Sequence, residues 1–220
     1  MIFTKGSDKI SMRIFNYILT IVKKDAIKNI SKNAVNNDEI VKEEVSMEQH
    51  KIYNVLDVAR YVVEYSLEKG TPISQIQLQK IIYYVQATFL VKKNGIPCFN
   101  EAILNWAYGP VVREVYDEFR YFGPRKITSI PQIHDVELDH DFKFIYNTVS
   151  FDSSFILDTD KRLIELVVNR YGTEPPFSLV EKTHSEGPWL DTQRNDEITK
   201  ELLYSYYSSN LSELGTLRVN

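Results

Sequence analysis

Residues 74–93 read SQIQLQKIIYYVQATFLVKK, and this stretch determines the expected fold. Ser74 stands three residues before Gln77, which is the spacing of a capping box and predicts a helix that starts here. The apolar residues at helical spacing are Leu78, Ile81, Ile82, Val85 and Phe89. Lys80 falls on the side opposite to them. The high apolar content predicts a central core helix, which the Asn-Gly pair at 94–95 ends.

The segments on either side of this helix predict two further helices and a short strand. An amphipathic helix over residues 55–66 precedes it and ends at Gly70. After it, residues 102–108 alternate, so that one strand face would carry Ala102, Leu104, Trp106 and Tyr108. The Gly109-Pro110 pair is expected to open a helix, because proline is preorganised for the first helical turn. Gly123-Pro124 is expected to close that helix.

The rest of the main body predicts one more strand and three more helices. Aromatic and polar residues alternate over residues 142–146, which suggests the strand. Helices are expected from residue 158 or 159 to Gly172, from the proline pair at 175–176, and from residue 195 or 196 onward. These elements together predict a mainly α (α+β) fold. It would be a compact single helical domain with a small antiparallel β element, plus an N-terminal helical extension.

The composition is that of an ordinary globular protein. The chain has 220 residues, of which 43% are hydrophobic and 25% charged, so it can bury a sizeable core and bulk disorder is excluded. A single cysteine, Cys98, excludes an internal disulfide framework and suggests a reducing compartment. The net charge of −4 does not favour a nucleic-acid binder. We therefore expect a cytoplasmic protein with no direct nucleic-acid partner.

The charge is uneven and marks the N-terminal segment as a separate unit. Residues 1–32 carry seven Lys or Arg residues against two Asp residues, a net charge of +5, so the rest of the chain carries −9. The segment could be an amphipathic helix that packs on the body or on a partner, a membrane-surface helix, or a segment outside the folded unit. We expect a basic extension with its linker over 1–46, a helical domain over 47–211 and a C-terminal tail over 212–220. Met47 could be an alternative translation start.

The residues do not form a recognisable catalytic or metal-binding pattern. His134, Glu137 and His140 lie close in sequence, but the aspartates around them indicate an acidic solvated stretch. Cys98 and His184 could be imagined as a nucleophile and its base, although the apolar setting of Cys98 favours an inert buried thiol. Nucleotide-binding, zinc-protease and serine-hydrolase motifs are missing from the sequence. We expect no catalytic residues, no metal and no cofactor.

Three segments together resemble the Panacea domain, the fold of SocA-like antitoxins and of phage-associated proteins often labelled GepA. They are LQKIIYYVQ at 78–86, WAYGPVVREVY at 106–116 and THSEGPW at 183–189. Their order and spacing fit over residues 52–207, and the second segment is the most specific. The resemblance does not reach residues 1–46.

The resemblance implies an antitoxin without enzymatic activity. Such a protein neutralises a cognate toxin, encoded nearby and often in a prophage, by binding it directly in a type II-like system. An alternative within the family is a proteolytic adaptor that delivers the toxin to an AAA+ protease. Two other classes stay open from the residues themselves: an enzyme that uses His184 with Glu186 or Arg113, and a membrane-associated module through residues 8–30.

The motif residues divide into two groups. The structural group contains the expected core anchors and the residues that set chain direction: Trp106, Gly109, Pro110, Gly123, Pro188 and Trp189. The candidate partner-binding group forms a small polar and aromatic surface: Tyr108, Arg113, Tyr116 and His184. The alternative to partner binding by Arg113 and His184 is a structural role. In that role they form internal hydrogen bonds that orient a turn.

Overall fold

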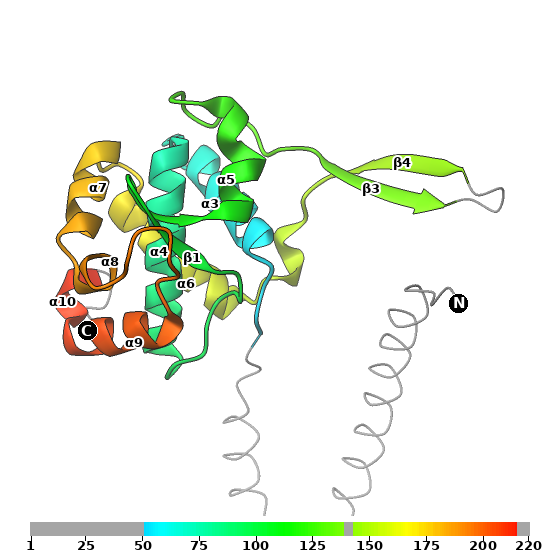
Figure 1. Cartoon of the computed structure of the whole chain (residues 1–220). Coiled ribbons are helices and arrows are strands. Elements are labelled where there is room, and N and C mark those ends of the chain that lie inside the picture. The colour runs from blue at the N-terminus through cyan, green and yellow to red at the C-terminus, as the bar shows by residue number, and fades with distance from the viewer. Residues whose placement is uncertain (1–50, 139–142, 215–220) are drawn as a thin grey trace, which may run out of the picture. The chain divides into compact units, whose positions relative to one another are not determined.

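Helix α4 (Gln75–Lys92) is the centre of the molecule, in a computed structural model that describes residues 51–138 and 143–214. Fifteen of its 18 residues are buried. The helices that contact it most extensively are α3 (Val55–Glu68), α6 (Asp158–Tyr171), α7 (Pro176–His184) and α9 (Lys200–Ser209), which Figure 1 shows around it. The predicted capping box is confirmed: the Ser74 and Gln77 side chains each accept from the other's backbone N–H. The prediction of a central core helix is also confirmed.

The polar residues of α4 are buried because chain segments cover the helix on every side, and their side chains bind those segments. Gln79 donates to the carbonyl of Val112 and accepts from its N–H, at 3.3 and 2.9 Å. Gln86 binds the backbone at Cys98 and Phe99 in the same way. Lys80, expected on the side opposite to the apolar residues, is also buried, with only 1% of its surface accessible.

The segment after Gly109 is a strand, so the predicted helix start at Gly109-Pro110 was wrong. Strands β1 (Ile103–Trp106) and β2 (Gly109–Val112) form an antiparallel hairpin in which Trp106 pairs with Gly109. Gly109 has a φ of 90°, which glycine adopts without strain and which turns the chain back along β1. Helix α5 begins only at Arg113 and runs to Phe119, followed by the short 3-10 helix η1 (Arg120–Phe122). Gly123 ends it as expected.

The face of β1 that is buried is the opposite of the one that carries the aromatic residues. Ile103 and Asn105 are buried, whereas Leu104 and Trp106 are half-buried. The reason is that residues 195–198 run along β1 and hydrogen-bond to its backbone at Ile103 and Asn105. The same hydrogen bonds tie residues 195–198 to β1, so the last long helix begins at Lys200, with Thr199 as its N-cap, and not at 195 or 196.

The remaining elements complete the body. Strands β3 (Ile133–Leu138) and β4 (Phe144–Val149) form a second antiparallel hairpin, which Figure 1 draws as an arm extending from the helices. After the 3-10 helix η2 (Ser153–Phe155), α6 begins at Asp158 with Leu157 as its N-cap, and the proline pair opens α7 as predicted. Two single turns follow, α8 (Gly187–Leu190) and α10 (Leu211–Leu214). The fold of this part of the chain is mainly α with a small antiparallel β element.

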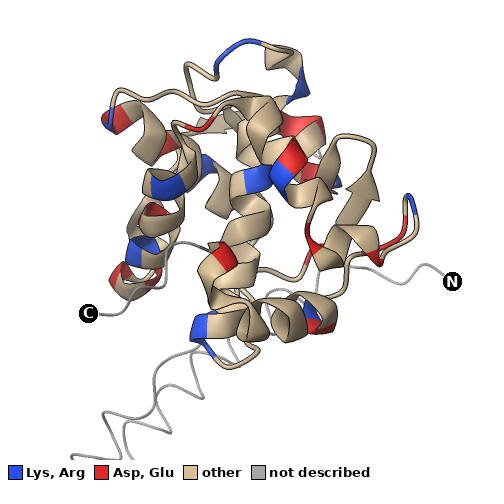
Figure 2. Ribbon diagram, turned by 90° about the vertical axis from the view of Figure 1, so that its left-hand side faces the viewer, with Lys and Arg blue, Asp and Glu red and all other residues tan. Residues whose placement is uncertain are grey.

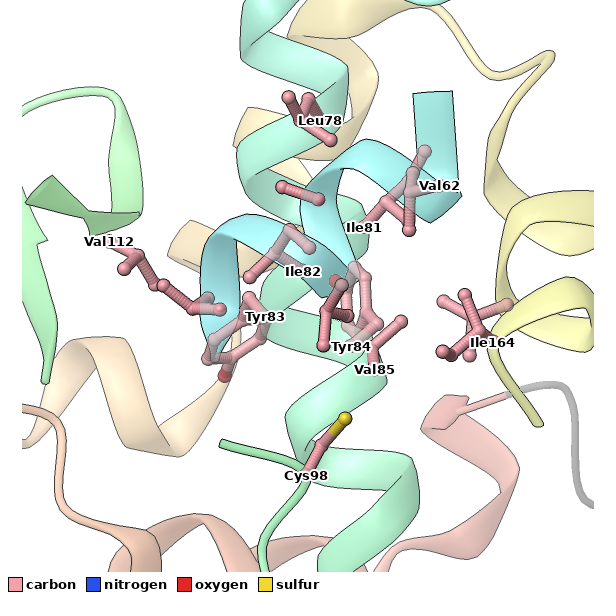
Figure 3. Close-up of a cluster of buried hydrophobic side chains, with 14 of the residues drawn as sticks. Val62, Leu78, Ile81, Ile82, Tyr83, Tyr84, Val85, Cys98, Val112 and Ile164 are labelled. Atoms are coloured by element: carbon pink, nitrogen blue, oxygen red, sulfur yellow. The ribbon is translucent and has the colours of Figure 1, made fainter. Parts of the chain in front are cut away.

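The core lies around the middle of α4. Figure 3 shows Ile81, Ile82 and Val85 of α4 among side chains from α3, β2 and α6. Leu214, within the segment expected as a tail, is completely buried in this cluster. Such contacts contribute about 25 cal/mol for each Å² of apolar surface removed from water, so the many large buried side chains are the main source of stability.

Several predictions lie outside the described residues. They include the amphipathic extension and linker over 1–46, the possible start at Met47, and the positions of His140 and Phe142. The residues that the structure describes belong to the unit His50–Asn220. No helix within residues 51–138 and 143–214 is both long and apolar enough to cross a membrane. Figure 2 shows acidic and basic residues mixed over the helices of this unit.

Candidate functional site

A pocket of about 400 Å³ opens between the β1–β2 turn and the first half of α4. The turn residues Ala107 and Tyr108 form one wall and the start of α4 forms the other. The lining residues used below are Gln75, Ile76, Lys80, Trp106, Tyr116 and Arg194. Seven of the thirteen residues that line the pocket are apolar or aromatic, a composition typical of sites that take organic ligands or partner side chains.

The structure brings three of the aromatic motif residues together at this pocket. Trp106, Tyr108 and Tyr116 all line it, and the rings of Trp106 and Tyr116 meet edge to face with centroids 5.3 Å apart. Tyr108 is 65% exposed at the tip of the hairpin. Gly123 lines the same pocket from the end of η1. An exposed tyrosine beside a half-buried tryptophan is the kind of surface that carries binding energy in protein interfaces.

Arg113 and His184 do not line the pocket. The Arg113 guanidinium lies on the exposed side of α5, 3.8 Å from the Asp117 carboxylate. His184, at the end of α7, stacks on Trp189 with ring centroids 3.9 Å apart. The four candidate partner-binding residues therefore do not converge on one cavity, although Arg113 remains available at the surface of α5.

The two tryptophans were both expected as core anchors, and both are half-buried. Trp189 is half-buried and packs against the core, and its indole N–H donates to the Trp106 carbonyl at 3.3 Å. Trp106 is half-buried and forms part of the pocket wall, because the buried face of β1 is the other one. Asn105, on that buried face, donates to the carbonyls of Trp189 and Thr192. The two motifs are thus joined through backbone contacts of β1 and α8.

The glycines of the motifs lie where other side chains come close to the backbone, and Pro188 is buried beside one of them. Pro188 is buried in α8, and a Cβ added at the preceding Gly187 would lie 2.8 Å from the Tyr206 ring. Gly109 is more tightly enclosed, because a Cβ there would lie 2.7 Å from Lys80 Cε and 2.7 Å from Thr183 Oγ1. The next residue of β2, Pro110, accepts a hydrogen bond from Lys80 through its carbonyl.

Lys80 is the buried charged residue among those that line the pocket. Its Nζ donates to the Pro110 carbonyl at 3.0 Å, and no carboxylate among the described residues forms an ion pair with it. Burial removes water from the ammonium group and lowers the pKa of Lys80 from 10.5 to about 7. The same lysine, together with burial as the larger cause, lowers the pKa of His184. His184 Nε2 is buried and lacks a hydrogen-bond partner in this part of the chain.

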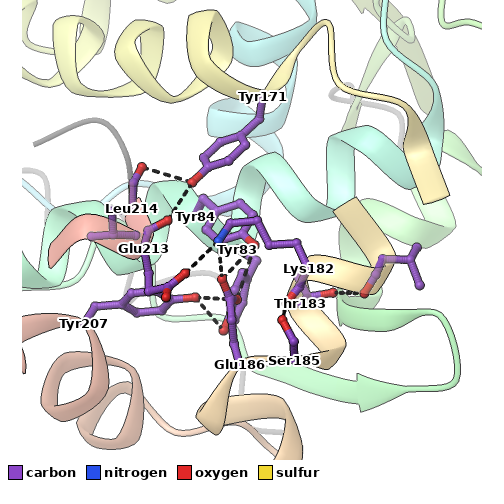
Figure 4. Close-up of polar contacts among 11 residues, drawn as sticks. Tyr83, Tyr84, Tyr171, Lys182, Thr183, Ser185, Glu186, Tyr207, Glu213 and Leu214 are labelled. Atoms are coloured by element: carbon purple, nitrogen blue, oxygen red, sulfur yellow. Dashed lines mark hydrogen bonds and ion pairs between the residues drawn. The ribbon is translucent and has the colours of Figure 1, made fainter. Parts of the chain in front are cut away.

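A second charged group, Glu186, is buried next to α4 but away from the pocket. Figure 4 shows its carboxylate among Tyr84, Tyr207 and Lys182. It accepts from Tyr84 at 3.1 and 3.2 Å and from Tyr207 at 2.7 Å, and lies 2.9 Å from the Lys182 ammonium. Burial raises the pKa of Glu186, although each of these partners opposes that rise. This network joins α4, α7, α8 and α9, so Glu186 is a structural centre of the third motif.

The arrangement gives no nucleophile and base of the kinds considered from sequence. Cys98 is buried in the core, where loss of hydration raises its thiol pKa and makes thiolate formation harder. Glu186 is occupied by two tyrosines and a lysine, while His184 stacks on a tryptophan. In residues 51–138 and 143–214, no three His, Cys, Asp or Glu side chains group as metal ligands would.

Sequence reasoning missed part of the pocket, above all Lys80 and Arg194. One signal could have found Lys80: a helix that is apolar nearly all round has no solvent face, so a lysine within it is either paired or faces a cavity. Arg194 enters the pocket only because residues 195–198 run along β1, and the local pattern does not reveal that pairing.

The chain belongs to the family described as "Antitoxin SocA-like, Panacea domain", whose model matches residues 78–190. This range contains all three sequence segments and most of the pocket. A similar relative is the protein named Antitoxin SocA from Caulobacter vibrioides, which is 40% identical over 75 residues. That match covers 32% of this chain and 39% of the relative, so the two share less than half of either length. No solved structure matches the chain.

Proposed function

We propose that this protein is an antitoxin that neutralises a cognate toxin by binding it directly, without doing chemistry. Membership of the SocA-like Panacea family is the observation that carries the proposal. Similarity to a protein named as an antitoxin supports it further. In this proposal the toxin is encoded next to the antitoxin, the two proteins meet in the cytoplasm, and nucleic acid takes no part.

The toxin is proposed to bind around the hairpin of β1 and β2. Tyr108 is the most exposed large aromatic residue of this region, and Tyr116 lines the same pocket. Tyrosine and arginine are enriched among the residues that dominate interface energies, so Arg113 on the neighbouring helix extends the candidate surface. His184 is retained as a candidate, acting through the position of Trp189, on which it stacks.

Co-expression of the adjacent open reading frame tests the proposal. The neighbouring protein should stop growth when expressed alone, and growth should recover when this full chain is expressed with it. Purification should then give a stable complex of the two proteins. If the neighbouring proteins are harmless alone, or if one is toxic and this chain does not rescue growth, the proposal is wrong.

The same cells distinguish simple occlusion from delivery to a protease. Occlusion predicts that the toxin persists in a stoichiometric complex, with an unchanged lifetime after synthesis is stopped. A proteolytic adaptor predicts that toxin lifetime falls when this chain is present, and that the fall disappears in cells without the AAA+ protease. We favour occlusion, because the described surface offers an exposed aromatic contact of the kind that stabilises complexes.

A further inference from the structure

The described part of the chain buries three basic residues, Arg60, Lys80 and Lys93, and Lys80 differs from the other two. Lys93 lies 2.6 Å from the Asp160 carboxylate, with both side chains almost completely buried. Arg60 lies 2.8 Å from Glu118. Lys182, which is partly buried, lies 2.9 Å from Glu186. Lys80 has only the carbonyl of Pro110, which satisfies one of its three N–H donors.

A buried ammonium group with an incomplete set of partners is costly, because it has lost water without gaining an anion. Lys80 is nonetheless one of the residues that line a cavity, although only 1% of its surface is accessible. The cavity is lined by a second cation, Arg194, and by no aspartate or glutamate. Its electrostatic environment therefore favours an anion. Its walls are largely apolar, so that anion must have an apolar body.

We propose that this pocket is a binding site for a small organic carboxylate, whose carboxylate pairs with Lys80 and whose aromatic or aliphatic body packs against Trp106 and Tyr116. The volume of about 400 Å³ lies within the range of small-ligand sites. The walls are preformed, since Gln75 donates to the Tyr116 carbonyl at 3.2 Å and Gln79 holds Val112 of β2. A pre-organised wall lowers the ordering cost of binding.

A monocarboxylate fits better than a phosphate or a dianion. Each further negative charge would have to leave water for a cavity in which Lys80 is the one buried cation and Arg194 lies at the exposed rim. An acidic side chain of a protein partner would satisfy Lys80 but would leave much of the pocket unfilled. This inference does not depend on the proposed function, since a ligand site can exist whether or not the chain binds a toxin.

Titration calorimetry on the full chain tests the proposal. Tryptophan fluorescence is a second measurement, because Trp106 lines the pocket. The probes are 3-phenylpropionate and indole-3-acetate, each paired with its neutral amide. The solution is kept at about pH 6, below the Lys80 pKa of about 7, so that the ammonium is charged. We expect the acids to bind with a Kd of about 1 mM or tighter. The amides should bind at least about tenfold more weakly than the acids.

Three variants locate the site. Lys80→Met should weaken binding of the acids about tenfold, whereas Lys92→Met, which removes an exposed lysine from the same helix, should leave it unchanged. Ile76→Phe fills the pocket while leaving Lys80 in place, so it should weaken binding of acids and amides alike. Circular dichroism of each variant shows whether it is folded, and Ile76→Phe keeps the test valid if Lys80→Met does not fold.

Four outcomes would overturn the proposal. The first is that neither acid binds up to about 10 mM. The second is that each amide binds as tightly as its acid. The third is that Lys80→Met, if it folds, and Ile76→Phe both bind like the natural chain. The fourth is that the acids fail to bind while the two pocket variants weaken capture of a purified toxin, which would make the pocket a protein contact instead.

Discussion

Lys80 and Glu186 are both ionisable, and each has only 1% of its surface accessible to solvent, but their surroundings differ. The Glu186 carboxylate has two tyrosine hydroxyls and one ammonium group as partners. The Lys80 ammonium has one backbone carbonyl as its partner, and Lys80 lines a cavity. One motif of the family thus contains a completed polar network, and another contains an incomplete one.

This difference separates buried charged side chains that stabilise the fold from those that are available to a ligand. A network in which every donor has an acceptor stabilises the folded chain and needs nothing further. A charge with missing partners lowers stability, and its retention beside a pocket is explained if a ligand supplies the missing group. The predictions below test that contrast through stability, in order of decreasing expected effect.

Glu186→Ala should give the largest loss. It leaves the hydroxyls of Tyr84 and Tyr207 buried without their acceptor, and an unsatisfied buried group costs about 1–3 kcal/mol. We therefore expect the free energy of unfolding, measured in urea, to fall by about 3 kcal/mol. Glu186→Gln is the control, because its amide oxygen can still accept from Tyr207, and its loss should be clearly smaller. Equal losses for the two variants would contradict the network's role.

Gly109→Ala should cost about 2–3 kcal/mol, because the new Cβ would meet Lys80 Cε and Thr183 Oγ1, both at 2.7 Å, in addition to the strain of a positive φ. Gly95→Ala is a matched control, since Gly95 has the same φ of 90° and no atom within 4 Å of the added Cβ. It should cost only about 1 kcal/mol. Thermal or urea unfolding measures both, and a control that costs as much as Gly109→Ala would show that the enclosure by Lys80 is unimportant.

Lys80→Met should stabilise the free protein by about 1–2 kcal/mol near neutral pH, because a poorly compensated ammonium is replaced by an apolar chain of similar length. Lys92→Met, on the exposed side of the same helix, should change stability by less than about 0.5 kcal/mol. Urea unfolding of the two variants and the natural chain measures the difference. Destabilisation by Lys80→Met would mean that its bond to Pro110 outweighs the cost of burial.

The pH dependence of this effect has a definite sign. The Lys80 pKa is lowered from 10.5 to about 7 on folding, so between these values the unfolded chain holds a proton that the folded chain has lost. Stability contributed by this group therefore rises as pH increases from about 7 to 10.5. The advantage of Lys80→Met should shrink over that range. An advantage that is constant with pH would show that Lys80 is not perturbed by burial.

Tyr108→Ala should have the smallest effect on stability, below about 0.5 kcal/mol, because the side chain is mostly in solvent. Its effect on toxin binding should be large, at least about tenfold in Kd, if the hairpin is the contact surface. Tyr204→Ala removes another exposed tyrosine, on α9, and should leave binding unchanged. Equal effects of the two variants on toxin affinity would place the interface elsewhere.

The sequence predicted the elements whose signals are local. The capping box at Ser74, the end of the following helix, the proline start of α7 and the glycine after η1 all depend on residues within about one turn of each other. The three motif segments were also readable as a family resemblance, which the family match confirms. The predictions that were wrong, at Gly109-Pro110 and at residues 195–196, concern segments whose backbone hydrogen-bonds to β1.

What the sequence determined by itself was a set of helices around one nearly apolar helix, since periodicity and capping arise within single segments. Only the tertiary structure decided that Lys80 is buried, that Trp106 forms a pocket wall, and that Arg194 reaches the same pocket. The physical reason is that burial of a polar side chain depends on what packs over it. That covering comes from segments 30 and more than 100 residues away along the chain, at Pro110 and Thr183.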